Sequence, residues 1–164
     1  GRLDEALIAT LQSIEINPGN PYSHMNLGII YKDLGRFDEA LSETLHCIKL
    51  NPSNPDIYFN LAIIYKDLGQ LDQAFSSMSR SLKLKPDDVN IIVNLGLIYK
   101  DLGAYVESEN CARKAIYLNQ ECDSAHLLLS DILFIHGKYE EALLEQRKGG
   151  GMIRLNLKKG ISVV

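Results

Sequence analysis

The chain has 164 residues, of which 46% are hydrophobic, and its 21 acidic residues outnumber its 17 basic residues to give a net charge of -4. This balance disfavours nucleic acid and anionic membranes as partners, because there is no basic surplus to hold phosphate groups. No apolar run reaches the roughly 18 residues that a membrane-spanning helix needs, and no signal-peptide pattern appears. We therefore expect a cytoplasmic protein that does not insert into membranes.

One five-residue stretch repeats without change along the chain. Tyr-Lys-Asp-Leu-Gly occupies residues 31–35 and returns at 65–69 and 99–103. Its closing glycine belongs to a 34-residue series: Gly1, Gly35, Gly69, Gly103 and Gly137. A fixed period of this length is typical of stacked helical units.

Apolar residues recur three and four positions apart between these glycines, which predicts amphipathic helices. Asn-Pro turns and the glycines separate the helices, since proline disfavours helix before it and glycine accepts the left-handed conformation at a helix end. In chain order we predict helices over 2–15, 22–34, 37–50, 56–68, 71–84, 90–102, 105–118, 124–136 and 138–148.

The last residues, 149–164, follow a different pattern. Gly149, Gly150 and Gly151 end the helical periodicity, and residues 152–157 alternate apolar and polar side chains before a second β-branched run at 161–164. This predicts a glycine-rich joint and a β-hairpin, with the turn at Lys158, Lys159 and Gly160. Because an isolated hairpin is only marginally stable, we expect it to cap the last helix pair or to begin a further domain.

The period and its residues resemble the tetratricopeptide repeat family. The matching residues recur in three successive copies: Asn26, Leu27, Gly28, Tyr31, Gly35, Phe37, Ala40 and Pro52; Asn60, Leu61, Ala62, Tyr65, Gly69, Leu71, Ala74 and Pro86; Asn94, Leu95, Gly96, Tyr99, Gly103 and Tyr105. Ser108 and Gln120 depart from the third copy, and the fourth keeps Gly137, Tyr139 and Ala142 but departs at Leu128, Ser130 and Leu133. The resemblance covers residues 1 to about 148.

The resemblance implies an all-α fold, a right-handed α-solenoid of antiparallel helix pairs. Residues 1–20 would form the second helix of a partial repeat, and residues 21–148 about four repeats over 21–54, 55–88, 89–122 and 123–148. The small residue at Ala40, Ala74 and Ala142 lets the two helices of a pair approach to about 8–10 Å.

Three asparagines recur without an obvious packing role: Asn26, Asn60 and Asn94. In the family this position faces the concave surface, and the series resembles the asparagine ladder of the O-linked N-acetylglucosamine transferases. Neighbouring helices at about 10 Å would place one amide at every third residue of an extended peptide, which advances about 3.3 Å per residue. The alternative is that these amides bond only to neighbouring helices or water. The ladder would stop at Leu128.

Apolar residues beside the asparagines complete the predicted peptide-binding groove. They are Tyr22, Met25, Ile29, Phe59, Ile63, Val93, Leu97 and Leu127. Exposed apolar surface of this kind marks interaction sites, unless a narrow superhelix hides part of it. The carboxylate clamp that binds acidic chaperone tails is not expected, because Met25, Ile29 and Asn90 stand where its charged residues would be.

We expect no catalytic residues, no cofactor and no metal site. The cysteines Cys47, Cys111 and Cys122 show no ligand spacing, and Cys122 with His126 would supply only two ligands. The predicted function is therefore a protein–protein interaction scaffold whose groove binds an extended segment of a partner. The alternatives are the substrate-recruiting arm of a larger enzyme such as a glycosyltransferase, or a module that self-associates through the ends of the array.

Overall fold

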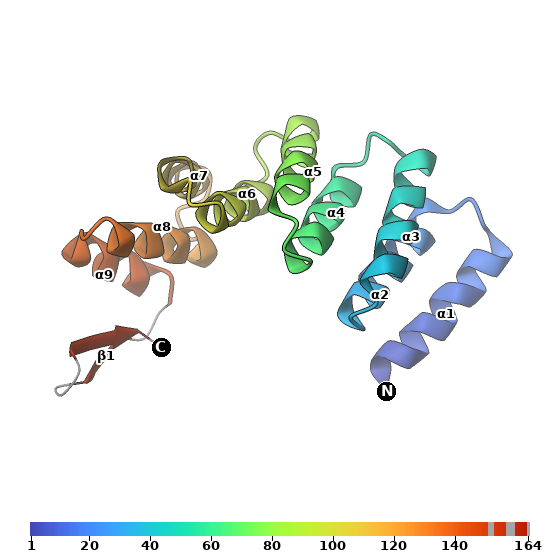
Figure 1. Cartoon of the computed structure of the whole chain (residues 1–164), viewed down its shortest axis with the longest axis horizontal. Coiled ribbons are helices and arrows are strands. Elements are labelled where there is room, and N and C mark those ends of the chain that lie inside the picture. The colour runs from blue at the N-terminus through green and yellow to red at the C-terminus, as the bar shows by residue number, and fades with distance from the viewer. Residues whose placement is uncertain (151–152, 157–159, 164) are drawn as a thin grey trace. The chain divides into compact units, whose positions relative to one another are not determined.

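The structure is a computed structural model that describes residues 1–150, 153–156 and 160–163. Over these residues it contains nine α-helices and two short strands. The chain divides into two compact units, Gly1–Pro86 with α1 to α5 and Asp87–Val164 with α6 to α9 and the strands (Figure 1). The prediction of helices throughout residues 22–148 is confirmed, while the right-handed superhelix stays a prediction.

The first helix of each pair begins and ends one residue earlier than predicted. These helices are α2 (Pro21–Asp33), α4 (Pro55–Asp67), α6 (Val89–Asp101) and α8 (Asp123–Ile135). The side chains of Asn20 and Asn54 accept the backbone N–H of the residue two positions later, at 3.0 and 2.9 Å. Because each asparagine caps the helix, the proline after it becomes the first helical residue, where its missing N–H costs little.

The second helix of each pair follows a glycine turn. The helices are α3 (Phe37–Leu50), α5 (Leu71–Leu84), α7 (Tyr105–Leu118) and α9 (Tyr139–Lys148), and α1 (Arg2–Ile16) follows Gly1 at the same place in the 34-residue period. Gly35 has φ of +74°, and the next residue donates its N–H to the carbonyl oxygen of Tyr31 at 2.8 Å. The same turn recurs at Gly69, Gly103 and Gly137, which confirms that glycine ends each first helix.

Small buried residues bring the two helices of each pair together. Ala40, Ala74 and Ala142 are 0% exposed. An added Cβ at Gly28 would lie 2.8 Å from Thr44 Oγ1, so α2 and α3 leave no room for a larger side chain there. Ser108, where the repeat pattern has alanine, is equally buried and donates its hydroxyl to the Gly96 carbonyl at 2.8 Å. The serine is tolerated because it is small and its hydroxyl is satisfied.

The segment after α9 contains the two strands. β1 (Ile153–Asn156) pairs with β2 (Gly160–Val163) in antiparallel register, with Ile153 opposite Val163 and Asn156 opposite Gly160. Lys158 and Lys159, which belong to the predicted turn, lie outside the described residues, and the role of this segment stays a prediction. None of the helices in the described ranges has the length and apolar character required to cross a bilayer.

Replacing Ala74 by leucine should destabilise the first unit. Three additional carbons would have to enter a position that is 0% exposed, and overpacking of this kind costs about 1–3 kcal/mol or more. Urea unfolding followed by circular dichroism measures the loss. The matched control is Ala9→Leu on the exposed face of α1, which should change stability by no more than about 0.5 kcal/mol. Equal effects at the two positions would contradict the packing argument.

Candidate functional site

In the first unit, α2 and α4 form a hollow of about 230 Å³. It is lined by Ile29, Lys32, Phe59, Asn60, Ile63 and Ile64. Four of these were predicted as groove residues, namely Ile29, Phe59, Asn60 and Ile63. Ile64 is buried, whereas the other lining residues are half-buried. The hollow is therefore an apolar depression with an amide and an ammonium group at its rim.

Two other predicted residues of this unit do not line the hollow. Met25 is half-buried, and Tyr22 is 60% exposed in the first turn of α2. Lys32 Nζ lies 3.0 Å from Asp33 Oδ1, the carboxylate of the next residue along the chain. That ion pair is partly exposed, and an exposed pair of this kind contributes little to stability.

None of the three recurring asparagines is buried between helices. Asn26 is exposed, and Asn60 and Asn94 are half-buried. Asn94 Nδ2 donates to the carbonyl oxygen of Asn90, one turn earlier in α6, at 2.9 Å. This bond lies within α6 itself and uses one of the two amide hydrogens of Asn94.

The second unit presents a different surface. Val93 was predicted to face the groove, but it is only 3% exposed and belongs to the buried core of the second unit, so it offers almost no surface to a ligand. Leu97 is half-buried and Leu127 is 38% exposed. Lys100 Nζ, equivalent to Lys32, lies 2.7 Å from Asp131 Oδ2 on α8. An ion pair between α6 and α8 thus occupies the position where the first unit has the apolar Ile63.

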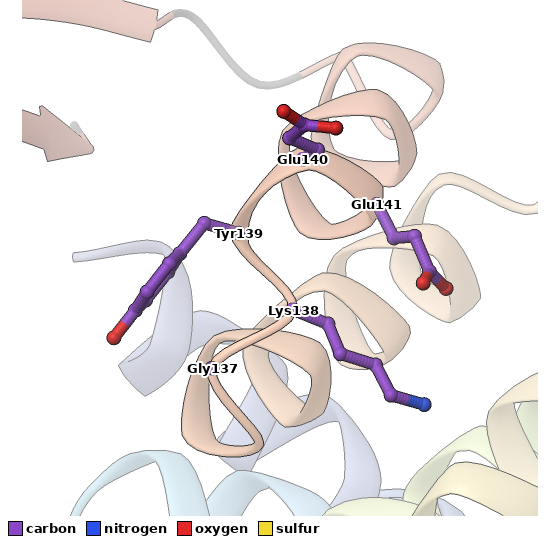
Figure 2. Close-up of a pocket in the computed structure, with 5 residues that line it drawn as sticks. All are labelled: Gly137, Lys138, Tyr139, Glu140 and Glu141. Atoms are coloured by element: carbon purple, nitrogen blue, oxygen red, sulfur yellow. The ribbon is translucent and has the colours of Figure 1, made fainter.

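Two further hollows lie in the second unit. Figure 2 shows the first, at the turn between α8 and α9, which is lined by the consecutive residues Gly137 to Glu141. Their side chains spread away from one another, so they do not converge on a ligand. The second hollow lies among α7, α8 and α9 and is lined by Arg113, Ile116, Tyr117, His126, Leu129, Glu145 and Lys148. One lining residue is His126, which the sequence suggested only as a possible metal ligand together with Cys122.

The histidine His126 does not share a ligand site with Cys122. Its two ring nitrogens contact Glu145 Oε2 at 2.6 Å and the Gln120 carbonyl at 2.8 Å, whereas Cys122 Sγ lies 3.4 Å from Ser124 Oγ. Within the described ranges, no cluster of three or more histidine, cysteine or acidic side chains is arranged to hold a metal ion.

The cysteines are free thiols in different surroundings. Burial raises the pKa of Cys47 to about 11, with a further contribution from the Glu43 carboxylate. Burial also raises the pKa of Cys111 to about 11. Since the thiolate is the reactive form, both groups should be poor nucleophiles at neutral pH.

Alkylation with iodoacetamide at pH 8 should therefore modify Cys122 first in the native protein. A thiol with a pKa near 11 is only about 0.1% thiolate at pH 8, and Cys47 is also enclosed. Peptide mapping by mass spectrometry at successive times measures the order of modification. In denaturant the three cysteines should react at similar rates. Native Cys47 or Cys111 reacting as fast as Cys122 would contradict the assignment.

Comparison with known proteins identifies the repeats. A tetratricopeptide repeat model matches residues 9–42 and 44–75, and a second model of the same repeat matches residues 89–122. No curated protein sequence matches the chain.

Solved structures with the same fold include pilF of Pseudomonas aeruginosa, at 19% identity over 93% of this chain and 71% of that chain, with a TM-score of 0.83. MamA (residue 41 to the end) from Desulfovibrio magneticus RS-1 is 19% identical over 92% of this chain and 85% of its own, with a TM-score of 0.79. A thermophilic repeat protein of Thermus thermophilus is 23% identical over 91% and 82%, with a TM-score of 0.77. Since the matched repeats span well over half of the sequence and the helix pairs follow the same period, the chain belongs to the tetratricopeptide repeat family.

Proposed function

We propose that this protein is an interaction scaffold whose first-of-pair helices bind an extended segment of a partner protein. The observation that carries the proposal is the recurrence of asparagine at one helix position, beside an apolar hollow in the first unit. Asn60 itself lines that hollow, and Asn26 lies on the other helix that forms it. In the second unit the same helix position is Asn94.

The asparagine amides would contact the main chain of the partner. An amide both donates to a carbonyl and accepts from an N–H, so it can pair with a peptide group whatever the neighbouring side chain is. Asn26 and Asn60 follow one another on α2 and α4, whose spacing corresponds to about three residues of extended chain. The asparagine series resembles the transferase asparagine ladder, and contacts to the main chain would allow segments of varied sequence to bind.

Side chains of the partner would enter the apolar surface. Ile29, Phe59 and Ile63 are half-buried around the hollow, so a side chain placed there would remove apolar area from water at about 25 cal/mol per Å². Leu97 and Leu127 supply the corresponding apolar surface in the second unit. In this proposal apolar contact supplies most of the affinity, and the asparagine amides fix the register of the bound segment. In the same scheme, residues 149–164 would act as a cap or as the start of a further domain.

The triple variant Asn26→Ala, Asn60→Ala, Asn94→Ala should bind peptide about one to three orders of magnitude more weakly. Each lost hydrogen bond costs about 0.5–1.5 kcal/mol, and 1.4 kcal/mol corresponds to tenfold in affinity. The probe is a peptide selected from a random displayed library against the unaltered chain, with its dissociation constant measured by calorimetry. The fold should persist, because alanine is a better helix former than asparagine.

Two controls separate main-chain recognition from general loss of binding. Asn110→Ala changes an exposed asparagine on α7 and should leave affinity unchanged. Methylating single backbone nitrogens of the bound peptide removes N–H groups that the asparagine side chains would accept. This should weaken binding to the unaltered chain but not to the triple variant, which no longer has these asparagine amides. If the triple variant folds and binds the peptide with unchanged affinity, the asparagines do not contact the partner. If Ile63→Ala binds with unchanged affinity, the hollow does not receive a side chain of the partner.

A further inference from the structure

A buried histidine in the second unit contacts acceptors with both ring nitrogens. His126, the fourth residue of α8, has Nε2 2.8 Å from the Gln120 carbonyl oxygen and Nδ1 2.6 Å from Glu145 Oε2 on α9. A carbonyl oxygen only accepts, so Nε2 must donate. An ionised carboxylate also only accepts, so Nδ1 must donate as well. Both contacts are satisfied together when the ring is an imidazolium ion that faces an ionised glutamate.

The first unit repeats this arrangement. His24 lies three 34-residue periods before His126 and is also the fourth residue of its helix, α2. Its Nδ1 lies 2.7 Å from Glu43 Oε2 on α3, and its Nε2 lies 2.8 Å from the Pro18 carbonyl oxygen. Glu43 and Pro18 stand three periods before Glu145 and Gln120. A histidine ring, a glutamate carboxylate and a loop carbonyl oxygen thus meet in both the first and the last of the helix pairs.

Charged neighbours keep the glutamate of the second unit ionised. Burial alone would raise the pKa of Glu145, but hydrogen bonds from Lys148 and from His126 outweigh burial and hold that pKa below its usual range. Lys148 Nζ lies 2.8 Å from Glu145 Oε1. Arg113 and Tyr117 of α7 line the same hollow as His126. The titratable residues that line this hollow with the histidine are therefore Arg113, Tyr117, Glu145 and Lys148.

The surroundings of the histidine in the first unit are simpler. The ring of His46, on α3, lies with its centroid 4.5 Å from that of His24. From α1, Ser13 Oγ lies 2.8 Å from Ser23 Oγ, beside the histidine in sequence. Glu43 supplies the carboxylate for the ring. Protonation of His46 would add a like charge, which opposes the effect of Glu43.

In the helix pair α4–α5, a tyrosine instead of a histidine contacts the loop before the pair. Tyr58 occupies the equivalent position and donates its hydroxyl to the Pro52 carbonyl oxygen at 3.1 Å, and Ser77 stands where the glutamates are. In α6 and α7 the equivalent residues are Ile92 and Cys111. A charged connection is thus not a requirement of the repeat.

We propose that His24 and His126 are proton-dependent locks between the loop before a helix pair and the second helix of that pair. Histidine is the side chain that changes charge between pH 5 and 8. When the ring loses a proton, a nitrogen lone pair faces an acceptor and one of the two bonds is lost. The stabilising effect is therefore present on the acidic side of neutrality and disappears as pH rises, provided that the glutamates remain ionised.

Nuclear magnetic resonance of the full chain labelled with ¹⁵N tests the protonation state directly. At pH 6 the rings of His24 and His126 should carry protons on both nitrogens, and those protons should exchange slowly because the rings are buried. Spectra of His24→Tyr and His126→Tyr assign the signals. A folded protein at pH 6 in which either ring carries a single proton would overturn the proposal for that site.

Thermal unfolding between pH 6 and pH 8.5 tests the consequence. The control transfers the tyrosine arrangement to both sites, as His24→Tyr with Glu43→Ser and His126→Tyr with Glu145→Ser. The unaltered chain should lose about 2–4 °C in unfolding midpoint for each lock over this range, and the control should lose much less. His136 remains in both proteins and cancels in the comparison. Because His46 contacts His24, the control at the second site alone, His126→Tyr with Glu145→Ser, gives the comparison in which the surroundings of His46 do not change.

Equal losses in the two proteins would refute the locks. If the control altered at both sites does not fold, each control altered at one site should remove about half of the pH-dependent loss in unfolding midpoint. The ring protonation measured on the unaltered chain tests the locks independently of these variants. A neutral ring at both sites, with an unfolding midpoint that does not depend on pH, would leave a purely structural role.

Discussion

Close approach of two antiparallel helices is the constraint on which the rest of the structure depends. Ala40, Ala74 and Ala142 are fully enclosed in their pairs, and the van der Waals space at Gly28 admits no extra carbon without displacing Thr44. Because the pair is held this closely, each first helix uses one face for its partner. The recurring asparagines lie on these first helices at positions that stay exposed or half-buried.

The turns make this packing repeatable. Asn20 and Asn54 start their helices by accepting backbone N–H groups, and a glycine with positive φ ends them. Both devices are local, so they do not depend on what the helix packs against. The chain can therefore change individual side chains inside a repeat while the backbone stays the same. His24 and Tyr58 illustrate this, since both reach the carbonyl oxygen of the preceding loop.

The two units use the same backbone for different surfaces. In the first unit, isoleucine at position 63 leaves an apolar hollow beside Asn60. In the second unit, Asp131 pairs with Lys100 and Leu128 is 1% exposed where an asparagine would continue the series. An ion pair between helices and a buried leucine are compatible with stacking, but they offer a ligand fewer amide and apolar contacts. The proposed binding of an extended segment therefore relies more on the first unit than on the second.

The sequence by itself determined the helices to within about one residue, the glycine turns and the family, because these follow from backbone preferences repeated at a fixed period. It also placed Ile29, Phe59, Asn60 and Ile63 on one face. Only the tertiary structure decided that Val93 is enclosed, that Asn94 bonds to its own helix, and that His24 and His126 meet glutamates 19 residues away. Burial and hydrogen-bond partners depend on side chains supplied by other helices, and those distances are set by packing rather than by local sequence.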